Sequence, residues 1–172
     1  MTQPVAPIRF GTDGWRAIIA DAFTFVNLER VTQAYCDYLR STSSTAGSSD
    51  SDAPLVVVGY DHRFLSEKFA ERSAEVIVGN GMNVALFEEA VPTPLVSWAV
   101  RENNAEGGVV ITASHNPPDF NGFKIKAPWG GSASPEITAG VEALLDTSPV
   151  KRSSSTVKTG GELLAKATES YR

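Results

Sequence analysis

The chain has 172 residues, of which 42% are hydrophobic and 20% are charged, and this composition suits a globular domain with a packed core. Its formal net charge is −5, whereas proteins that bind nucleic acids or membrane surfaces need a positively charged surface, so we expect neither partner. Cys36 is the single cysteine, and no glycosylation sequon, signal pattern or membrane-length apolar run occurs. These features predict a cytoplasmic protein.

Residues 8–20 predict two short strand-like pieces hinged on Gly11 and Gly14. Two glycines around a Thr-Asp pair favour a tight bend whose amides could face an anion, with Arg16 beside it. A structural turn is the alternative for so short a pattern.

A helix is expected from Asn27, a possible cap, to about Arg40, because apolar residues recur there on one helical face. Residues 41–53 are rich in Ser, Thr and Asp and predict a surface loop. Asp50 and Asp52 could mimic a metal-binding pair, but a solvated acidic run is favoured because a flexible loop cannot hold ligand geometry.

The apolar run at residues 55–60 predicts a central parallel strand buried on both faces. His62 and Arg63 follow at its carboxyl end, and a helix is expected from Ser66, a possible cap, to Gly79. Arg63 precedes the positive end of that helix. It is therefore a candidate for the electrostatics of a binding site, the alternative being a surface ion pair.

Further strands are expected at 82–87, 107–111 and 123–127, with helices opening near 91–95 and spanning 135–145. Alternating strands and helices predict a three-layer α/β/α domain with a mostly parallel central sheet. We expect this domain to occupy residues 1–148, and residues 149–172 to form a linker and the truncated start of a second domain.

The strand at 107–111 runs into a loop that carries Ser114, at the sheet edge where open α/β sheets place their ligands. Two prolines, Pro117 and Pro118, stiffen the loop. Asn121-Gly122 is a turn dipeptide expected to bring Lys124 back towards the serine. A serine needs a base, a cationic pocket or prior phosphorylation before it reacts, and three nearby side chains could supply the first two. They are His115, Lys124 and Lys126.

Two other chemistries for Ser114 fit less well. A hydrolase elbow needs glycine two residues either side of the serine, and Thr112 and Asn116 stand there. His115 is adjacent in the backbone and poorly placed as a base for its neighbour, which leaves His62 for a Ser-His arrangement. The sequence contains no Gly-x-x-x-x-Gly-Lys-Ser/Thr motif, so a nucleotide-binding loop of that kind is not indicated.

The run Thr-Ala-Ser-His-Asn-Pro-Pro-Asp-Phe-Asn-Gly-Phe-Lys, residues 112–124, resembles the phosphoserine loop of the α-D-phosphohexomutases, T-A-S-H-N-P-x-x-x-N-G-x-K. Residues 10–16 and 59–66 resemble two further signatures of that family. The resemblance implies that Ser114 is the phosphorylated residue, that Arg16 contacts its phosphate, and that His115 and Lys124 orient phosphate and move protons. Further candidates for binding phosphate or substrate are Arg63, Lys126 and Asn116.

The same resemblance implies a phosphoglucomutase- or phosphomannomutase-type enzyme that interconverts hexose 1- and 6-phosphates through a bisphosphate. It implies Mg²⁺ bound through the Ser114 phosphate, and glucose 1,6-bisphosphate as activator. It covers the family's first domain alone, because the acidic metal loop of the later domains II–IV has no match here. We therefore expect this chain by itself to be inactive or nearly so. The alternative is a non-catalytic module that binds a sugar phosphate or a partner.

Overall fold

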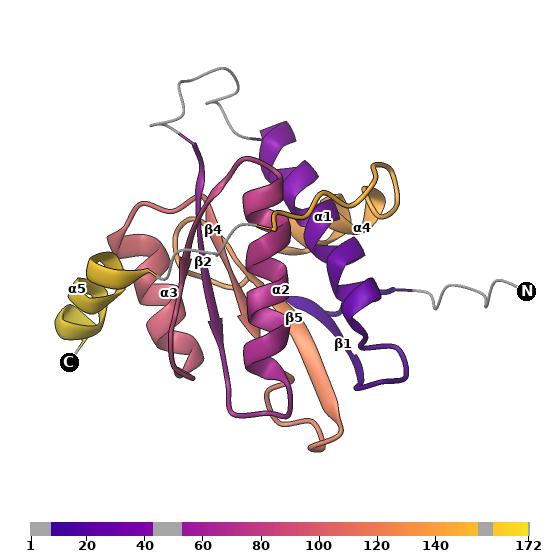
Figure 1. Ribbon diagram of the computed structural model, residues 1–172, viewed down its shortest axis with the longest axis horizontal. Coiled ribbons are helices and arrows are strands. Elements are labelled where there is room, and N and C mark those ends of the chain that lie inside the picture. The colour runs from indigo at the N-terminus through magenta and orange to yellow at the C-terminus, as the bar shows by residue number, and fades with distance from the viewer. Residues whose placement is uncertain (1–7, 43–52, 155–159, 172) are drawn as a thin grey trace, which may run out of the picture.

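A computed structural model describes residues 8–42, 53–154 and 160–171. One sheet has the strand order β1-β5-β4-β2-β3, and helices cover both of its faces (Figure 1). The strands are β1 (Gly14–Ile18), β2 (Leu55–Tyr60), β3 (Asn83–Leu86), β4 (Gly107–Ile111) and β5 (Phe120–Lys126). The helices are α1 (Phe25–Thr42), α2 (Ser66–Gly79), α3 (Thr93–Glu102), α4 (Pro135–Ala143) and α5 (Gly161–Tyr171).

The predicted three-layer arrangement is confirmed, and the valines of β2 show how it forms. Val56 and Val58 pack into the larger core together with α1, α2 and α4, whereas Val57 packs into a second core with α3 and α5. Successive residues of a strand point to opposite faces, so a strand covered on both sides must be apolar at every position. Each of these valines is fully buried.

The sheet is only partly parallel. β2 pairs in parallel with β3 and with β4, whereas β5 pairs antiparallel with β4 and with β1. Only β5 is therefore reversed among the described strands. It reverses because the chain turns back through the loop after β4 without a crossover helix, which parallel pairing would need.

Three local predictions were wrong. Residues 8–20 contain one strand, β1, instead of two strand-like pieces. Asn121 and Gly122 lie inside β5, paired with β1, so the chain reverses earlier, before Phe120. Helix α1 begins ahead of Asn27, whose backbone N–H donates to the Thr24 hydroxyl, and Ser66 is the first residue of α2 and not its cap.

Helix α5 lies against α3, and its buried residues Leu164 and Ala167 join the second core. The boundary proposed near residue 148 stays a prediction. Asp50 and Asp52 lie outside the described residues. Among the helices that the structure describes, none is both long and apolar enough to span a membrane.

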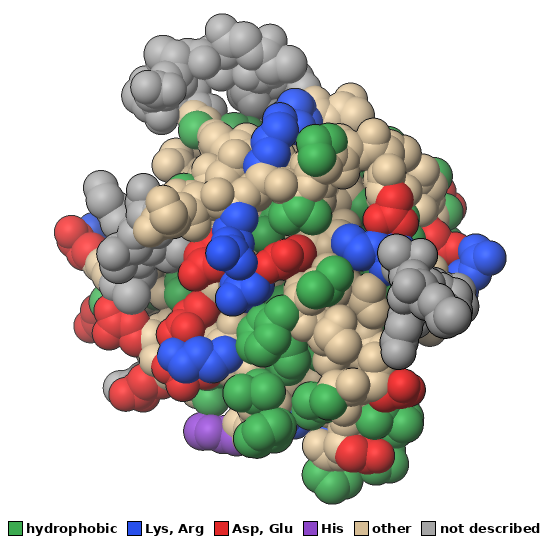
Figure 2. Space-filling model, turned by 45° about the vertical axis from the view of Figure 1, so that its right-hand side comes forward, with side chains coloured by type: hydrophobic (Ala, Val, Ile, Leu, Met, Phe, Trp, Pro, Cys, Tyr) green, Lys and Arg blue, Asp and Glu red, His purple; other side chains and the backbone are tan. Residues whose placement is uncertain are grey.

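Ion pairs cover the outer face of α1 and α2. Glu29 accepts from Arg72 and Arg152 at 2.7 and 3.1 Å, and both arginines also approach Glu75. Figure 2 shows the same pattern over its visible face, where basic side chains are interspersed with acidic ones. Positive charge on this face is therefore largely compensated locally.

Candidate functional site

Ser114 lies just beyond β4 in a compact turn and is exposed to solvent. Its φ angle is 57°, a left-handed conformation that is uncommon outside glycine and costs on the order of 1 kcal/mol or more. The turn closes on itself, because the Ser114 N–H donates to the Thr112 hydroxyl at 3.0 Å and the Asn116 N–H donates to the Ala113 carbonyl at 3.1 Å. The hydroxyl is thus presented on a defined loop.

The two histidines contribute differently. His115 Nδ1 lies 3.4 Å from Ser114 Oγ, at the outer limit of a hydrogen bond, so the neighbouring ring comes within reach despite its adjacency in the chain. His62 is exposed, and no contact within the described ranges joins it to Ser114. Neither ring is paired with a carboxylate in that part of the chain, so a Ser-His-acid triad has no structural support there.

The pairing of β1 with β5 gathers the cations predicted for the site. Gly14 lies opposite Lys124 and Arg16 lies opposite Gly122, so both cationic residues are placed on neighbouring strands. Asp13 links them: its carboxylate lies 3.0 Å from Lys124 Nζ and 3.6 Å from an Arg16 terminal nitrogen. All three side chains are mostly shielded from solvent.

Arg16 also joins this ion group to the serine loop. Its Nη1 donates to the side-chain oxygen of Asn116 at 3.1 Å. Gly122 makes this possible, because a Cβ there would lie 2.9 Å from Arg16 Cγ and 2.6 Å from the Thr112 carbonyl oxygen. The sequence resemblance placed Arg16 beside the phosphoserine, and the structure places it against the loop that carries Ser114.

Lys126 follows Lys124 by two residues on β5, so the two side chains leave the same face of the strand. Lys126 is largely buried, and this burial lowers the pKa of its ammonium, with repulsion from Lys124 adding to the effect and Asp13 opposing it. No polar contact of its ammonium is found among the described residues. Its assignment to phosphate binding stays a prediction.

Arg63 is fully engaged within the protein. Its two terminal nitrogens donate to four backbone carbonyls of the serine loop, and its Nε lies 3.4 Å from the Asp61 carboxylate. A guanidinium has five N–H donors, and the four on its terminal nitrogens are hydrogen-bonded to these carbonyls. The predicted role of Arg63 in binding phosphate stays untested, but in this conformation its terminal nitrogens already donate to backbone carbonyls.

Sequence reasoning missed several residues that build this site. Asp13 was noted only as part of a turn, because its proximity to Lys124 depends on antiparallel pairing between strands far apart in the chain. Ser66 and Asn121 were read as a helix cap and a turn residue, yet they hydrogen-bond to each other at 2.9 Å beneath the loop. The available signal was Asn121 itself, a polar residue entering a strand whose alternate residues are buried.

The described residues do not by themselves form a Mg²⁺ site. They contain no group of three or more Asp, Glu, His or Cys side chains that could hold a metal ion. Asp13 is the carboxylate linked to the loop cations, and it is already occupied by Lys124 and Arg16. Hard cations take six or more oxygen ligands, so Ser114 would supply only one of them through its phosphate.

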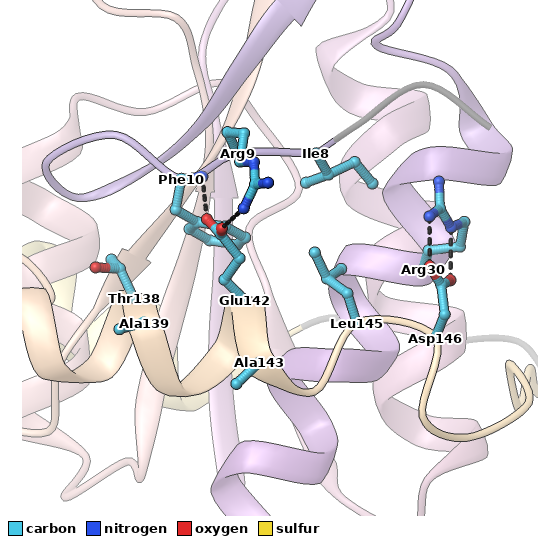
Figure 3. Close-up of a pocket in the computed structure, with 10 residues that line it drawn as sticks. All are labelled: Ile8, Arg9, Phe10, Arg30, Thr138, Ala139, Glu142, Ala143, Leu145 and Asp146. Atoms are coloured by element: carbon cyan, nitrogen blue, oxygen red, sulfur yellow. Dashed lines mark hydrogen bonds and ion pairs between the residues drawn. The ribbon is translucent and has the colours of Figure 1, made fainter. Parts of the chain in front are cut away.

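A separate groove lies between the first described residues and α4 (Figure 3). The Glu142 carboxylate there accepts from the Phe10 N–H and from Arg9, and Asp146 is paired with Arg30. The contacts of Glu142 fasten residues 9 and 10 to α4, and the two ion pairs leave the charges of the groove paired. The groove shares no lining residue with the Ser114 loop.

Comparison with known proteins identifies the family. Residues 7–151 match the family profile described as phosphoglucomutase/phosphomannomutase, alpha/beta/alpha domain I. The chain belongs to this family. It spans about a quarter of the length of the curated relatives that it matches.

Among these relatives, a protein of Schizosaccharomyces pombe provisionally named a phosphoribomutase is 38% identical over 144 residues, which is 81% of this chain and 23% of that protein. The phosphoglucomutase of Staphylococcus epidermidis RP62A is 35% identical over 142 residues, covering 81% of this chain and 24% of the enzyme. Both align with this chain over about the length of the matched domain.

Solved structures of the phosphoglucomutase/phosphomannomutase family share the fold. A crystal structure from Thermus thermophilus, provisionally named a phosphomannomutase, superimposes with a TM-score of 0.77 at 40% identity, covering 91% of this chain and 33% of that one. The phosphoglucomutase-related parafusin of Paramecium, in its open form, gives a TM-score of 0.69 at 24% identity over 87% of this chain and 27% of its own. The second likeness concerns the fold alone.

Proposed function

We propose that this domain supplies the phosphoryl-carrying serine of a mutase that interconverts hexose 1-phosphate and hexose 6-phosphate. The observation that carries the proposal is the exposed Ser114 hydroxyl on a turn whose Asn116 side chain is hydrogen-bonded to Arg16, which Asp13 links to Lys124. Family membership supports the class of reaction, since the curated relatives include phosphoglucomutases and phosphomannomutases. A cytoplasmic location suits Cys36, a free buried thiol.

The transfer step requires charge stabilisation more than covalent chemistry. The bond between the Ser114 oxygen and phosphorus breaks, a bond from the sugar hydroxyl oxygen to phosphorus forms, and the hydroxyl proton leaves to a base. Arg16 and Lys124 would balance the negative charge of the transferred group. His115, within 3.4 Å of Ser114 Oγ, is placed to exchange the proton with the serine oxygen.

The ion pair between Lys124 and Asp13 assigns Lys124 a donor role in the free protein. An ammonium that donates to a carboxylate at 3.0 Å has no lone pair with which to accept a proton. We therefore place Lys124 as a cationic partner of the phosphate, and it could accept the hydroxyl proton only after losing one of its own. Asn116 would support the phosphate through Arg16, to which it is hydrogen-bonded.

We propose Mg²⁺ as the metal of the complete site, where it would neutralise phosphate charge, and glucose 1,6-bisphosphate as the source of the serine phosphate. Because the described residues alone do not form a Mg²⁺ site, we expect the 172-residue polypeptide to show little or no turnover. Further domains with the acidic metal loop would be its partners.

The nucleophile is tested by mass spectrometry after incubation with glucose 1,6-bisphosphate and Mg²⁺. We expect a single phosphoryl adduct mapping to Ser114, and none in Ser114→Ala. Ser153→Ala, outside the site, is the matched control and should still be labelled. An adduct at another residue would remove Ser114 from its role.

Turnover is tested separately with a coupled assay for conversion of glucose 1-phosphate to glucose 6-phosphate. Labelling of Ser114 without turnover agrees with a phosphoserine domain that needs the rest of an enzyme. If the chain shows neither labelling nor turnover, that result would support the alternative of a non-catalytic module. Turnover by the purified polypeptide would contradict the expected inactivity.

A further inference from the structure

The carbonyl groups of the Ser114 loop converge on one side chain that comes from a different part of the chain. Arg63 Nη2 donates to the carbonyls of Ser114 and Asn116 at 2.8 and 2.7 Å. Its Nη1 donates to the carbonyls of Pro117 and Phe120 at 2.7 and 3.0 Å. A single guanidinium therefore satisfies four acceptors of the turn that presents the serine.

This arrangement is specific to arginine. Four carbonyl oxygens that point at one place repel each other unless a cation with several donors lies among them. A guanidinium offers a planar fork of fixed donors, whereas a lysine offers three donors on one atom and cannot reach four acceptors in this geometry. The Arg63 side chain is only 15% exposed, which strengthens these charge-assisted bonds.

A second layer of hydrogen bonds holds the guanidinium in place. The Asp61 carboxylate accepts from the Arg63 backbone N–H at 2.9 Å, from the Ser66 hydroxyl at 2.9 Å, and lies 3.4 Å from Arg63 Nε. Ser66 in turn accepts from the Asn121 amide at 2.9 Å. The clamp is thus anchored to the first turn of α2 and to the beginning of β5.

The left-handed backbone of Ser114 explains why such a clamp is needed. That conformation is unfavourable for a serine, and within the described part of the chain the loop's own backbone hydrogen bonds do not use the Ser114 or Asn116 carbonyls. Without the guanidinium these carbonyls would have to find water or turn away. The loop would then leave the conformation in which Asn116 is bonded to Arg16 and the Ser114 hydroxyl is presented to solvent.

We propose that Arg63 is a positioning residue for Ser114, and that its guanidinium holds the loop in its reactive conformation instead of binding substrate phosphate. This inference rests on the proposed function only in naming Ser114 as the phosphoryl carrier. The geometry of the clamp itself is independent of the ligand.

Amide hydrogen exchange tests the clamp without any phosphate. In Arg63→Ala and Arg63→Lys we expect the amides of residues 112–122 to exchange about tenfold faster or more, while α1 and β2 keep their protection. Added methylguanidinium at millimolar concentration should restore protection in Arg63→Ala. Arg40→Ala is the matched control, because Arg40 also bonds a backbone carbonyl, that of Asn80, but far from this loop.

Labelling of Ser114 by glucose 1,6-bisphosphate then links the clamp to function, and its rate should fall at least tenfold in Arg63→Lys and stay unchanged in Arg40→Ala. Unchanged loop exchange in Arg63→Ala, or equal acceleration across the whole chain in both variants, would overturn the proposal. If exchange responds as expected but wild-type Ser114 is never labelled, the clamp stands and the proposed function fails.

Discussion

At the scale of single residues, two tyrosines differ in one hydrogen bond. The Tyr35 hydroxyl is fully buried and has no hydrogen-bond partner among the described residues, whereas the Tyr60 hydroxyl donates to the Glu88 carbonyl at 2.8 Å. Burial raises the pKa of Tyr35 far above its usual range, so this hydroxyl stays neutral at physiological pH.

Removing the two hydroxyls should therefore affect stability differently. We expect Tyr35→Phe to leave the free energy of unfolding unchanged or to raise it by up to about 1 kcal/mol, because an unsatisfied buried polar group is lost. Tyr60→Phe should lower it by about 0.5–1.5 kcal/mol, because a hydrogen bond is lost. Urea denaturation measures both, and a loss above about 1 kcal/mol in Tyr35→Phe would show that its hydroxyl is bonded.

Gly122 tests the packing on which Arg16 depends. Its missing Cβ leaves room for the Arg16 side chain and the Thr112 carbonyl, so Gly122→Ala should destabilise the fold by about 1–3 kcal/mol. Gly11→Ala is the control, since a Cβ there meets only the Gly14 carbonyl oxygen at 3.6 Å and should cost under about 0.5 kcal/mol. Equal thermal stability of the two variants would contradict this account of Gly122.

The contacts of Asp13 and Arg63 could not be predicted from the sequence. The motif around Ser114 predicts the loop and its cations because those residues are neighbours in the chain. Asp13 could not be placed beside Lys124 in that way, since the pairing of β1 with β5 joins residues more than a hundred positions apart. Nor could the position of Arg63 in the sequence show that it binds backbone carbonyls and not a ligand, because carbonyl and phosphate oxygens both accept hydrogen bonds from a guanidinium.

At the scale of elements, Glu142 of α4 fastens the segment before β1 to the body of the domain. Its carboxylate accepts the Phe10 N–H at 2.8 Å and pairs with Arg9 at 2.7 Å, as Figure 3 shows. These two interactions, the backbone hydrogen bond foremost, lower the pKa of Glu142 below its ordinary value of 4.5. The tether therefore depends on an ionised carboxylate.

The sign of the pH effect follows from that depressed pKa. The stabilisation is fully present above pH 4.5, the ordinary value, and is lost as pH falls through the lower pKa of the folded state. We expect Glu142→Gln to be less stable than wild type by up to about 1 kcal/mol at pH 7, with the difference disappearing in strong acid. A difference that persists or grows in acid would assign the tether to something other than charge.

Long periodic elements were predicted well and short ones less well. The β-branched runs of β2 and β4 and the amphipathic pattern of α2 are recognisable in the sequence, because burial determines the spacing of their apolar residues. β1 and the start of β5 were misjudged because Gly14, Asn121 and Gly122 favour turns locally. Their strand conformation comes from the antiparallel pairing of β1 with β5, which overrides local preference.

At the scale of the whole molecule, Cys36 reports on global unfolding. It lies in the larger core, is fully buried, and burial raises the pKa of its thiol to about 12. We expect the thiol to react with a disulfide reagent at pH 8 at least about a thousandfold more slowly in the native chain than in urea. Rapid native labelling would mean that α1 leaves the sheet without global unfolding.

The position of β1 in the sheet has a consequence for biosynthesis. Among the described strands β1 pairs with β5 alone, so Trp15 must wait for Phe123 before its backbone hydrogen bonds form. A ribosome delivers the first of these residues long before the second, and pairings between distant segments are slow to form. We therefore expect the nascent chain to carry an unpaired strand with an apolar Trp until β5 has been synthesised, a stretch that a chaperone would have to shield.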